Sequence, residues 1–282
     1  EPIWVTAEKQ GLKSASFYWV GSEASGQRPS IWKRYDQKVS FDARIDSMVA
    51  WFSLPDKSRP NLVMLYFHEP DWTGHEEGPG SWKTLKKVRD MDAVLGRILE
   101  KTSALSISDN LNIIVTSDHG MAAVSGKKII DVTKYSDLSD FRVEGGGPKI
   151  FISSDSQNDL EAVYDKLKSI EHVQVFRKKD IPDRWHYRNH VRIPDILLVA
   201  DEGWWMKPLS RRSHPKGDHG YDNALQSMHA IFVGDGPAFK DGYLRGTIDN
   251  IHVYPLAAHI LGLTPYKGID GSLDAVRDLL RD

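Results

Sequence analysis

The feature that most constrains the fold is a strand–helix–strand pattern between residues 60 and 116. Leu62–Phe67 and Leu111–Thr116 are almost continuously apolar, which is typical of strands buried on both faces. Between them, Ser81 is suited to cap a helix. This order predicts an α/β fold with a mostly parallel sheet, right-handed crossovers and flanking helices. The apolar residues at helical spacing are Leu85, Val88, Met91, Val94, Leu95, Ile98 and Leu99.

A second pattern, at about residues 135–190, predicts a small strand–helix–strand insert that could form a subdomain. Lys149–Ser153 and Val173–Phe176 have the composition of short strands. Asp159–Ile170 has its apolar residues on one helical face. After the insert we expect two more strands of the main sheet and a final helix, at Asp195–Ala200, Ala230–Val233 and about Asn250–Leu261.

Composition excludes several classes of protein. A chain of 282 residues is long enough for one large α/β domain. Its formal net charge of −2 shows no bias toward nucleic acid or anionic membranes. The chain has no cysteine, which excludes disulfides and Cys-based metal sites. It contains no run of about 18 apolar residues, so we expect no membrane-spanning segment.

Three short segments, far apart in the sequence, each pair Asp with His. The first two follow the apolar runs, and ligands of parallel α/β sheets bind beyond the carboxyl ends of the strands. The motifs therefore lie where the predicted fold would place a site. The segments are Asp71-Trp72-Thr73-Gly74-His75, Ser117-Asp118-His119-Gly120 and Gly217-Asp218-His219-Gly220-Tyr221-Asp222-Asn223.

These side chains have the chemistry of metal ligands, because zinc takes nitrogen from neutral His and oxygen from Asp. Asp71 and His75 are expected on a glycine-containing loop that bends both toward one ion. Asp118 and His119 either converge at the turn that follows them or serve two neighbouring metals, and His219 would come from a glycine-flanked loop. A single such pair is more often a hydrogen-bonded loop pair than a ligand set, but three in one chain favour metal. Two adjacent metals would suit hydrolysis of a phosphate ester.

At these motifs the chain resembles the nucleotide pyrophosphatase/phosphodiesterase (type I phosphodiesterase) family of the alkaline phosphatase superfamily. The resemblance runs from the first residue nearly to the last, and its motifs occur in the family's order. The segments that carry it are Glu1–Ala7, Pro70–Pro79, Thr116–Met121, Gly217–Asn223 and Gly271–Leu273.

The resemblance implies an alkaline phosphatase-like fold and a two-zinc phosphodiesterase. Asp71, His75 and His219 would hold one zinc, and Asp118 and His119 would help to hold the other. In the family the second zinc also takes an Asp and the nucleophilic Thr from an earlier region. Residues 1–282 are thus expected to be the larger, C-terminal portion of one catalytic domain, without that region. We expect two zinc ions in the intact domain, at most one in this chain, and little or no activity from this chain alone.

The resemblance also implies a small-molecule substrate. Trp19 and Tyr35 match the positions where family members stack a nucleotide base, and such stacking tolerates different bases. The alternative is that both aromatics anchor the core. The expected substrate is a nucleotide or another phosphodiester, nucleic acid is not required, and the expected location is periplasmic or extracellular.

Two other functions remain open. One is another phosphoester hydrolase or transferase of the same superfamily, such as a phosphomonoesterase, a sulfatase or a phosphoglycerol-type transferase. Sulfatases need a modified Cys or Ser, and the absence of cysteine argues against that member. The other is a metal-binding module without catalysis, against which the five candidate ligands argue.

Overall fold

The computed structural model describes residues 1–207 and 213–281. The chain forms two compact units. Unit 1 comprises Glu1–His68, Asp90–Thr116 and Phe232–Asp282, and unit 2 comprises Glu69–Arg89 and Ser117–Ile231. None of the helices in the described ranges combines the length and the hydrophobicity needed to cross a membrane.

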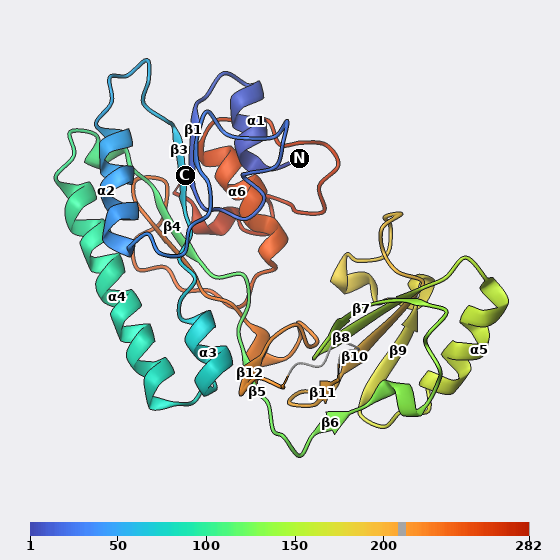
Figure 1. Ribbon diagram of the computed structural model, residues 1–282. Helices are drawn as coiled ribbons and strands as arrows, with labels where there is room; N and C mark the ends of the chain where they lie inside the picture. The colour runs from blue at the N-terminus through green and yellow to red at the C-terminus, as the bar shows by residue number, and fades with distance from the viewer. Residues whose placement is uncertain (208–212, 282) are drawn as a thin grey trace. The chain divides into compact units, whose positions relative to one another are not determined.

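Unit 1 contains a parallel sheet and a separate antiparallel pair of strands (Figure 1). The parallel sheet has the order β2-β1-β3, with Ala15 of β1 opposite Ile31 of β2 and Val63 of β3. Strand β4, which follows the 22-residue helix α4, pairs antiparallel with β13. The parallel arrangement predicted for Leu62–Phe67 and Leu111–Thr116 is therefore not found: β3 lies in the parallel sheet with β1 and β2, whereas β4 pairs antiparallel with β13 in a different ladder. The strands are β1 (Ser14–Phe17), β2 (Ile31–Lys33), β3 (Leu62–Leu65), β4 (Ile113–Thr116) and β13 (Phe232–Asp235).

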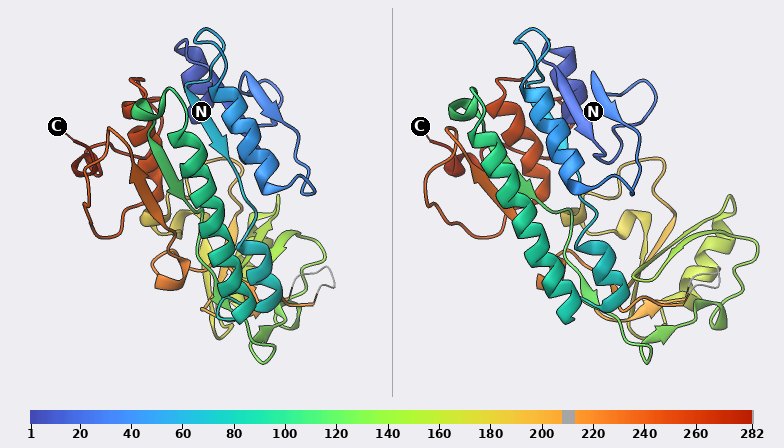
Figure 2. Two further views of the ribbon diagram at one scale, coloured as in Figure 1. Left: turned by 90° about the vertical axis from the view of Figure 1, so that its left-hand side faces the viewer. Right: turned by 60° about the vertical axis from the view of Figure 1, so that its left-hand side comes forward.

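Helices α2 and α4 lie side by side in both views of Figure 2. Arg97 of α4 donates to Asp42 of α2 at 2.8 Å, and Lys101 pairs with Asp46 one turn further along both helices. Ser81 accepts a hydrogen bond from the Thr84 N–H at 3.1 Å, which confirms the predicted cap of α4. The helices that contribute to unit 1 are α1 (Ile3–Lys9), α2 (Phe41–Phe52), α4 (Trp82–Ser103) and α6 (Val253–Ile260).

Unit 2 is built on a four-stranded antiparallel sheet of order β7-β8-β10-β9. The expectation that Asp195–Ala200 resumes the main parallel sheet is wrong, because β10 pairs antiparallel with β8 and β9. An apolar run predicts a buried strand but does not identify its partners. The elements of this layer are β7 (Arg142–Gly146), β8 (Lys149–Ser153), α5 (Gln157–Leu167), β9 (Val173–Arg177) and β10 (Ile196–Ala200).

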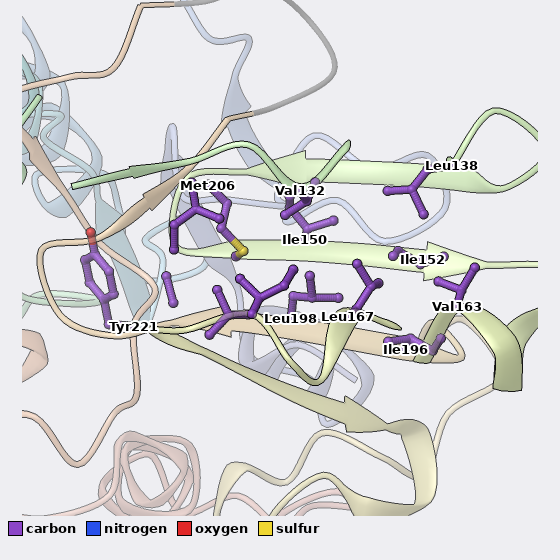
Figure 3. Packing of buried hydrophobic residues seen from close by; sticks show 14 of the residues in the cluster. Val132, Leu138, Ile150, Ile152, Val163, Leu167, Ile196, Leu198, Met206 and Tyr221 are labelled. Atoms are coloured by element: carbon purple, nitrogen blue, oxygen red, sulfur yellow. The ribbon is translucent and has the colours of Figure 1, made fainter. Parts of the chain in front are cut away.

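The core of unit 2 lies between this sheet and α5. Figure 3 shows Val163 and Leu167 of α5 close to the sheet residues Ile152 and Leu198, and all four belong to one buried cluster. Leu167, Ile152 and Leu198 are fully buried. This layer gives the loops around it a rigid base.

Two short ladders bring distant loops of unit 2 together. β12 (Gly217–Asp218) pairs antiparallel with β5 (Ala122–Ala123), and β11 (Trp205–Met206) pairs parallel with β6 (Ile129–Ile130). The first ladder places the segment before His219 beside the segment after His119. The remaining elements are α3 (Asp71–Glu77) and the 3-10 helices Ser108–Asn110, Val132–Lys134, Lys178–Asp180, Asp183–Trp185, Gln226–Met228, Asn250–His252 and Arg277–Leu279.

Candidate metal centre

Asp71 and His75 lie on a helix rather than on the predicted loop. They occupy the first and fifth positions of α3, so both side chains lie on one face, one turn apart. Gly74 leaves that helix without a side chain where Met121 packs, since an added Cβ would lie 2.5 Å from the Met121 sulfur. The helix can therefore approach the neighbouring loop closely.

His219 reaches α3 through β12. A Cβ on Gly217 would lie 2.6 Å from the carbonyl oxygen of Gly74, so the two backbones meet at glycine on both sides. His75 Nδ1 donates to the carbonyl oxygen of Gly217 at 2.8 Å. This hydrogen bond ties α3 to the segment that carries His219 and leaves His75 Nε2 as the lone-pair nitrogen.

Three ligand atoms converge at this point. Asp71 Oδ1 lies 3.4 Å from His75 Nε2 and 3.6 Å from His219 Nε2. Within the described residues, these three side chains form a group whose ligand atoms all lie within 4.8 Å of one another. Asp71 Oδ1 is buried and has no hydrogen-bond partner in the described chain. An orphaned buried carboxylate oxygen is costly, which makes a cation a fitting partner.

The spacing of these atoms also fits a metal. Hydrogen bonds of this type are about 2.7–3.2 Å long, shorter than either contact. Two ligands at about 2.0–2.1 Å from a tetrahedral zinc ion lie about 3.3 Å apart. The Asp71–His75 and Asp71–His219 separations are close to that value. The chemistry and spacing of these residues are therefore compatible with a shared metal ion.

The protonation of His219 suits a ligand. Burial lowers its pKa to about 4, helped by the neighbouring His119 and His75 imidazoles and opposed by the Asp71 carboxylate. The imidazole is therefore neutral near pH 7, the form that binds metal.

Asp118 and His119 converge at the turn that follows them. Asp118 Oδ2 lies 3.4 Å from His119 Nε2, and His119 Nδ1 donates to the carbonyl oxygen of Gly120 at 2.9 Å. The His119 ring stacks on the His219 ring, with centroids 3.4 Å apart. Four of the five predicted ligands are thus linked by direct contacts around His219, and Asp118 joins them through His119.

Trp19 and Tyr35 lie in unit 1, where they line a pocket of about 340 Å³. Trp19 is 37% exposed and Tyr35 is 45% exposed. Tyr18 also lines the pocket, is buried, and packs edge-on against Tyr35 at 5.0 Å between ring centroids. The remaining lining residues are Val20, Gly21, Glu23 and Tyr66.

Sequence reasoning missed several residues of both regions. Asp218 precedes His219 within a quoted motif and could have been found by that adjacency. Trp205 contacts Asp218 only through the fold, and no local signal marks it. Tyr18 and Glu23 of the pocket are close in sequence to Trp19, which was the available signal.

Fold and cluster together define an α/β protein with a candidate metal-binding group. Residues 1–222 match the family model described as type I phosphodiesterase / nucleotide pyrophosphatase. The chain belongs to that family.

Known relatives agree with this assignment. The chain is 38% identical over 289 residues to the mouse bis(5'-adenosyl)-triphosphatase enpp4, covering 100% of this chain and 62% of the relative. It is 36% identical over 287 residues to the Naja atra venom phosphodiesterase, covering 97% of this chain and 35% of the relative. The chain thus spans about three fifths of the length of the mouse relative and about one third of the cobra relative.

A solved structure shows the same fold. The murine ectonucleotide pyrophosphatase/phosphodiesterase 5, an inactive threonine-to-alanine variant in complex with AMP, matches with a TM-score of 0.93 at 34% identity. The match covers 100% of this chain and 75% of that one. The predicted fold class, α/β of the alkaline phosphatase type, is confirmed by this likeness.

Proposed function

We propose that this chain forms the larger part of a zinc-dependent hydrolase that cleaves nucleotide phosphodiester or pyrophosphate bonds and releases nucleoside monophosphates. Family membership supports the reaction class. The observation that carries the proposal is the convergence of His75 Nε2 and His219 Nε2 on the orphaned Oδ1 of Asp71.

In this proposal Asp71, His75 and His219 hold one zinc ion, and Asp118 and His119 provide part of the site for a second. Bound zinc would supply a Lewis acid that stabilises negative charge on phosphoryl oxygens. The chain's own contribution is to present imidazoles in a fixed orientation. The Nδ1 atoms of His75 and His119 each donate to a backbone carbonyl, which directs both Nε2 lone pairs into the cluster.

We propose that Trp19 and Tyr35 bind the nucleotide base. Their exposed faces and the pocket beside them support this role over a purely structural one. The AMP bound by the murine relative supports a nucleotide ligand. The names of the relatives, ectonucleotide enzymes and venom phosphodiesterases, support action outside the cytoplasm.

We also propose that the attacking group is a Thr hydroxyl from a segment outside these 282 residues. The family resemblance assigns the nucleophile to Thr, and none of the Thr residues here stands in that motif context. The inactive threonine-to-alanine variant of the murine relative supports this role for Thr. Residues 1–282 would then bind zinc and nucleotide without completing the reaction.

The test compares residues 1–282 with a longer protein that also contains the Thr-bearing segment proposed above. Both are assayed on a chromogenic nucleotide phosphodiester and on the matching phosphomonoester, with zinc and after chelation. We expect turnover only from the longer protein with zinc, and faster on the diester. Equal turnover by both proteins would refute the external nucleophile. Faster monoester cleavage would indicate a phosphomonoesterase, and zinc binding without turnover by either protein would indicate a metal-binding module.

A further inference from the structure

The Asp218 carboxylate is fixed by two hydrogen bonds next to the candidate ligands. Oδ1 accepts the backbone N–H of His219 at 2.8 Å, and Oδ2 accepts the indole N–H of Trp205 at 2.8 Å. The Asp218 side chain is 17% exposed, and Trp205 is buried. Both oxygens therefore have a defined partner, and the rotamer of the carboxylate is set by a buried ring.

The dipeptide Gly217–Asp218 contacts both candidate His ligands. The Gly217 carbonyl accepts from His75 Nδ1 at 2.8 Å, while the Asp218 carboxylate holds the backbone of His219. Asp218 Oδ1 also lies 4.0 Å from His75 Nδ1, so its negative charge faces the protonated side of that imidazole. A negative charge beside the ring nitrogen that donates to Gly217 helps to hold the imidazole in this orientation.

The Lys149 side chain packs against the backbone of Gly220 and is influenced by the charge of Asp218. Burial lowers the pKa of Lys149, and the charge of Asp218 opposes that shift. A Cβ on Gly220 would lie 2.9 Å from Lys149 Nζ, and Gly220 has φ +104°, so this backbone packs directly on the Lys149 side chain. Asp218 therefore accepts a hydrogen bond from the His219 backbone, and the next residue, Gly220, packs against Lys149.

We propose that Asp218 is a positioning residue for the metal site, holding His219 through its backbone and His75 through the adjoining carbonyl and its charge. The inference rests on the proposed metal-binding function of Asp71, His75 and His219. Asp218 does not contact the ion. Its carboxylate fixes where the two imidazole nitrogens meet, so its loss weakens metal binding while every ligand remains.

The substitution that isolates this role is Asp218→Asn. An amide nitrogen cannot accept from an N–H donor, so either the His219 amide or the Trp205 indole loses its acceptor, and the negative charge disappears. Side-chain volume is almost unchanged. We expect zinc affinity to fall by about 10–100-fold.

Zinc affinity is measured on residues 1–282 by competition with a chromogenic chelator at fixed pH. Trp205→Phe removes the indole donor and keeps an aromatic ring, and we expect a smaller loss because the bond to the His219 amide remains. Asp222→Asn is the matched control: its carboxylate lies in the same loop and binds Arg184 and the Ala224 N–H. We expect its affinity to stay within about twofold of wild type, below the effect of a ligand-orienting group.

Two readouts separate positioning from general stability. Urea unfolding without metal reports whether each variant is folded, and the visible spectrum of the Co²⁺ form reports coordination geometry. Reduced affinity in folded Asp218→Asn, with an altered Co²⁺ spectrum, supports the proposal. Unchanged affinity, or an equal loss in Asp222→Asn, overturns it. If Asp218→Asn does not fold, the zinc affinity and Co²⁺ spectrum of Trp205→Phe are compared with those of Asp222→Asn in the same way.

A separate control tests the proposed metal site independently of the role of Asp218. A triple variant with Asp71, His75 and His219 all changed to Ala defines the background. If wild-type protein binds zinc no more tightly than this variant, the metal site itself is absent. If wild type binds zinc more tightly than the triple variant, and Asp218→Asn has the same zinc affinity as wild type, only the proposed role of Asp218 is wrong.

Discussion

Three strands with nearly equivalent sequences differ in burial between the two units. β10 in unit 2 reads Ile-Leu-Leu-Val-Ala, and every residue is at most 3% exposed. β3 (Leu-Val-Met-Leu) and β4 (Ile-Ile-Val-Thr) in unit 1 are largely half-buried. Among the described residues, β10 pairs with strands on both sides, whereas β3 and β4 each pair with one. Hydrophobicity therefore indicates a strand, but what covers its two faces decides how far it is buried: Ile196 and Leu198 of β10 pack in one buried cluster and Leu197 and Val199 in another.

The two units also differ in the chemistry they hold. Unit 2 carries the Asp/His cluster, in which backbone carbonyls orient the imidazoles of His75 and His119. Unit 1 carries a pocket whose aromatic walls are partly exposed. We therefore expect unit 2 to respond to metal and unit 1 to respond to nucleotide.

The largest expected effect tests the burial comparison with matched substitutions. Leu198→Ala in β10 removes a fully buried side chain and should lower the free energy of unfolding by about 2–5 kcal/mol. Leu62→Ala in half-buried β3 should cost less than about 2 kcal/mol. Urea unfolding followed by far-UV circular dichroism measures both. Equal costs would show that β3 is as well packed as β10.

Zinc binding should stabilise unit 2. At free zinc about 100-fold above the dissociation constant, the gain is about 2.7 kcal/mol. Hydrogen exchange followed by mass spectrometry should show added protection in α3 and β12 but not in β1. His219→Ala should abolish the gain, while His172→Ala, whose ring instead contacts Asp201 and Trp204, should keep it. Full protection in His219→Ala would contradict the ligand assignment.

Nucleotide binding should depend on unit 1. Tyr35→Ala removes a stacking face and should weaken AMP binding by about 1–3 kcal/mol, measured by calorimetry. Binding of ribose 5-phosphate, which has no base, should change little. Tyr135→Ala is the matched control, since Tyr135 in unit 2 is also 45% exposed. If both variants bind AMP equally well, Tyr35 does not contact the base.

The smallest expected effect compares one helix cap from each unit. Ser40 Oγ accepts from the Ala43 N–H at 3.2 Å at the start of α2, and Ser156 Oγ accepts from the Asp159 N–H at 3.4 Å at the start of α5. Ser40→Ala should cost about 1 kcal/mol of unfolding free energy. Ser156→Ala should cost less, because its hydrogen bond is longer. A larger cost for Ser156 in urea unfolding would reverse this order.

Local features of the sequence predicted much of this structure. The Ser81 cap and the amphipathic helices follow from spacing, and Asp71, His75 and His219, proposed as ligands from their residue types, do lie together. Long-range packing decided the rest. The β12–β5 ladder and the contact between Gly74 and Gly217 bring His219 to α3, and neither leaves a local trace. The prediction of the sheet to which β10 belongs was wrong for the same reason, because strand pairing depends on segments remote in sequence.

The division of the chain into units has a consequence for fragment expression. The backbone crosses the border between them four times, after His68, Arg89, Thr116 and Ile231. One of these crossings falls inside the continuous helix α4. No contiguous gene fragment encodes either unit, and removing residues 117–231 would leave Glu69–Arg89, with Asp71 and His75, behind. Expressing one unit alone requires rejoining separate segments, and the candidate ligands Asp71, His75 and His219 cannot be transferred to another protein as one contiguous segment.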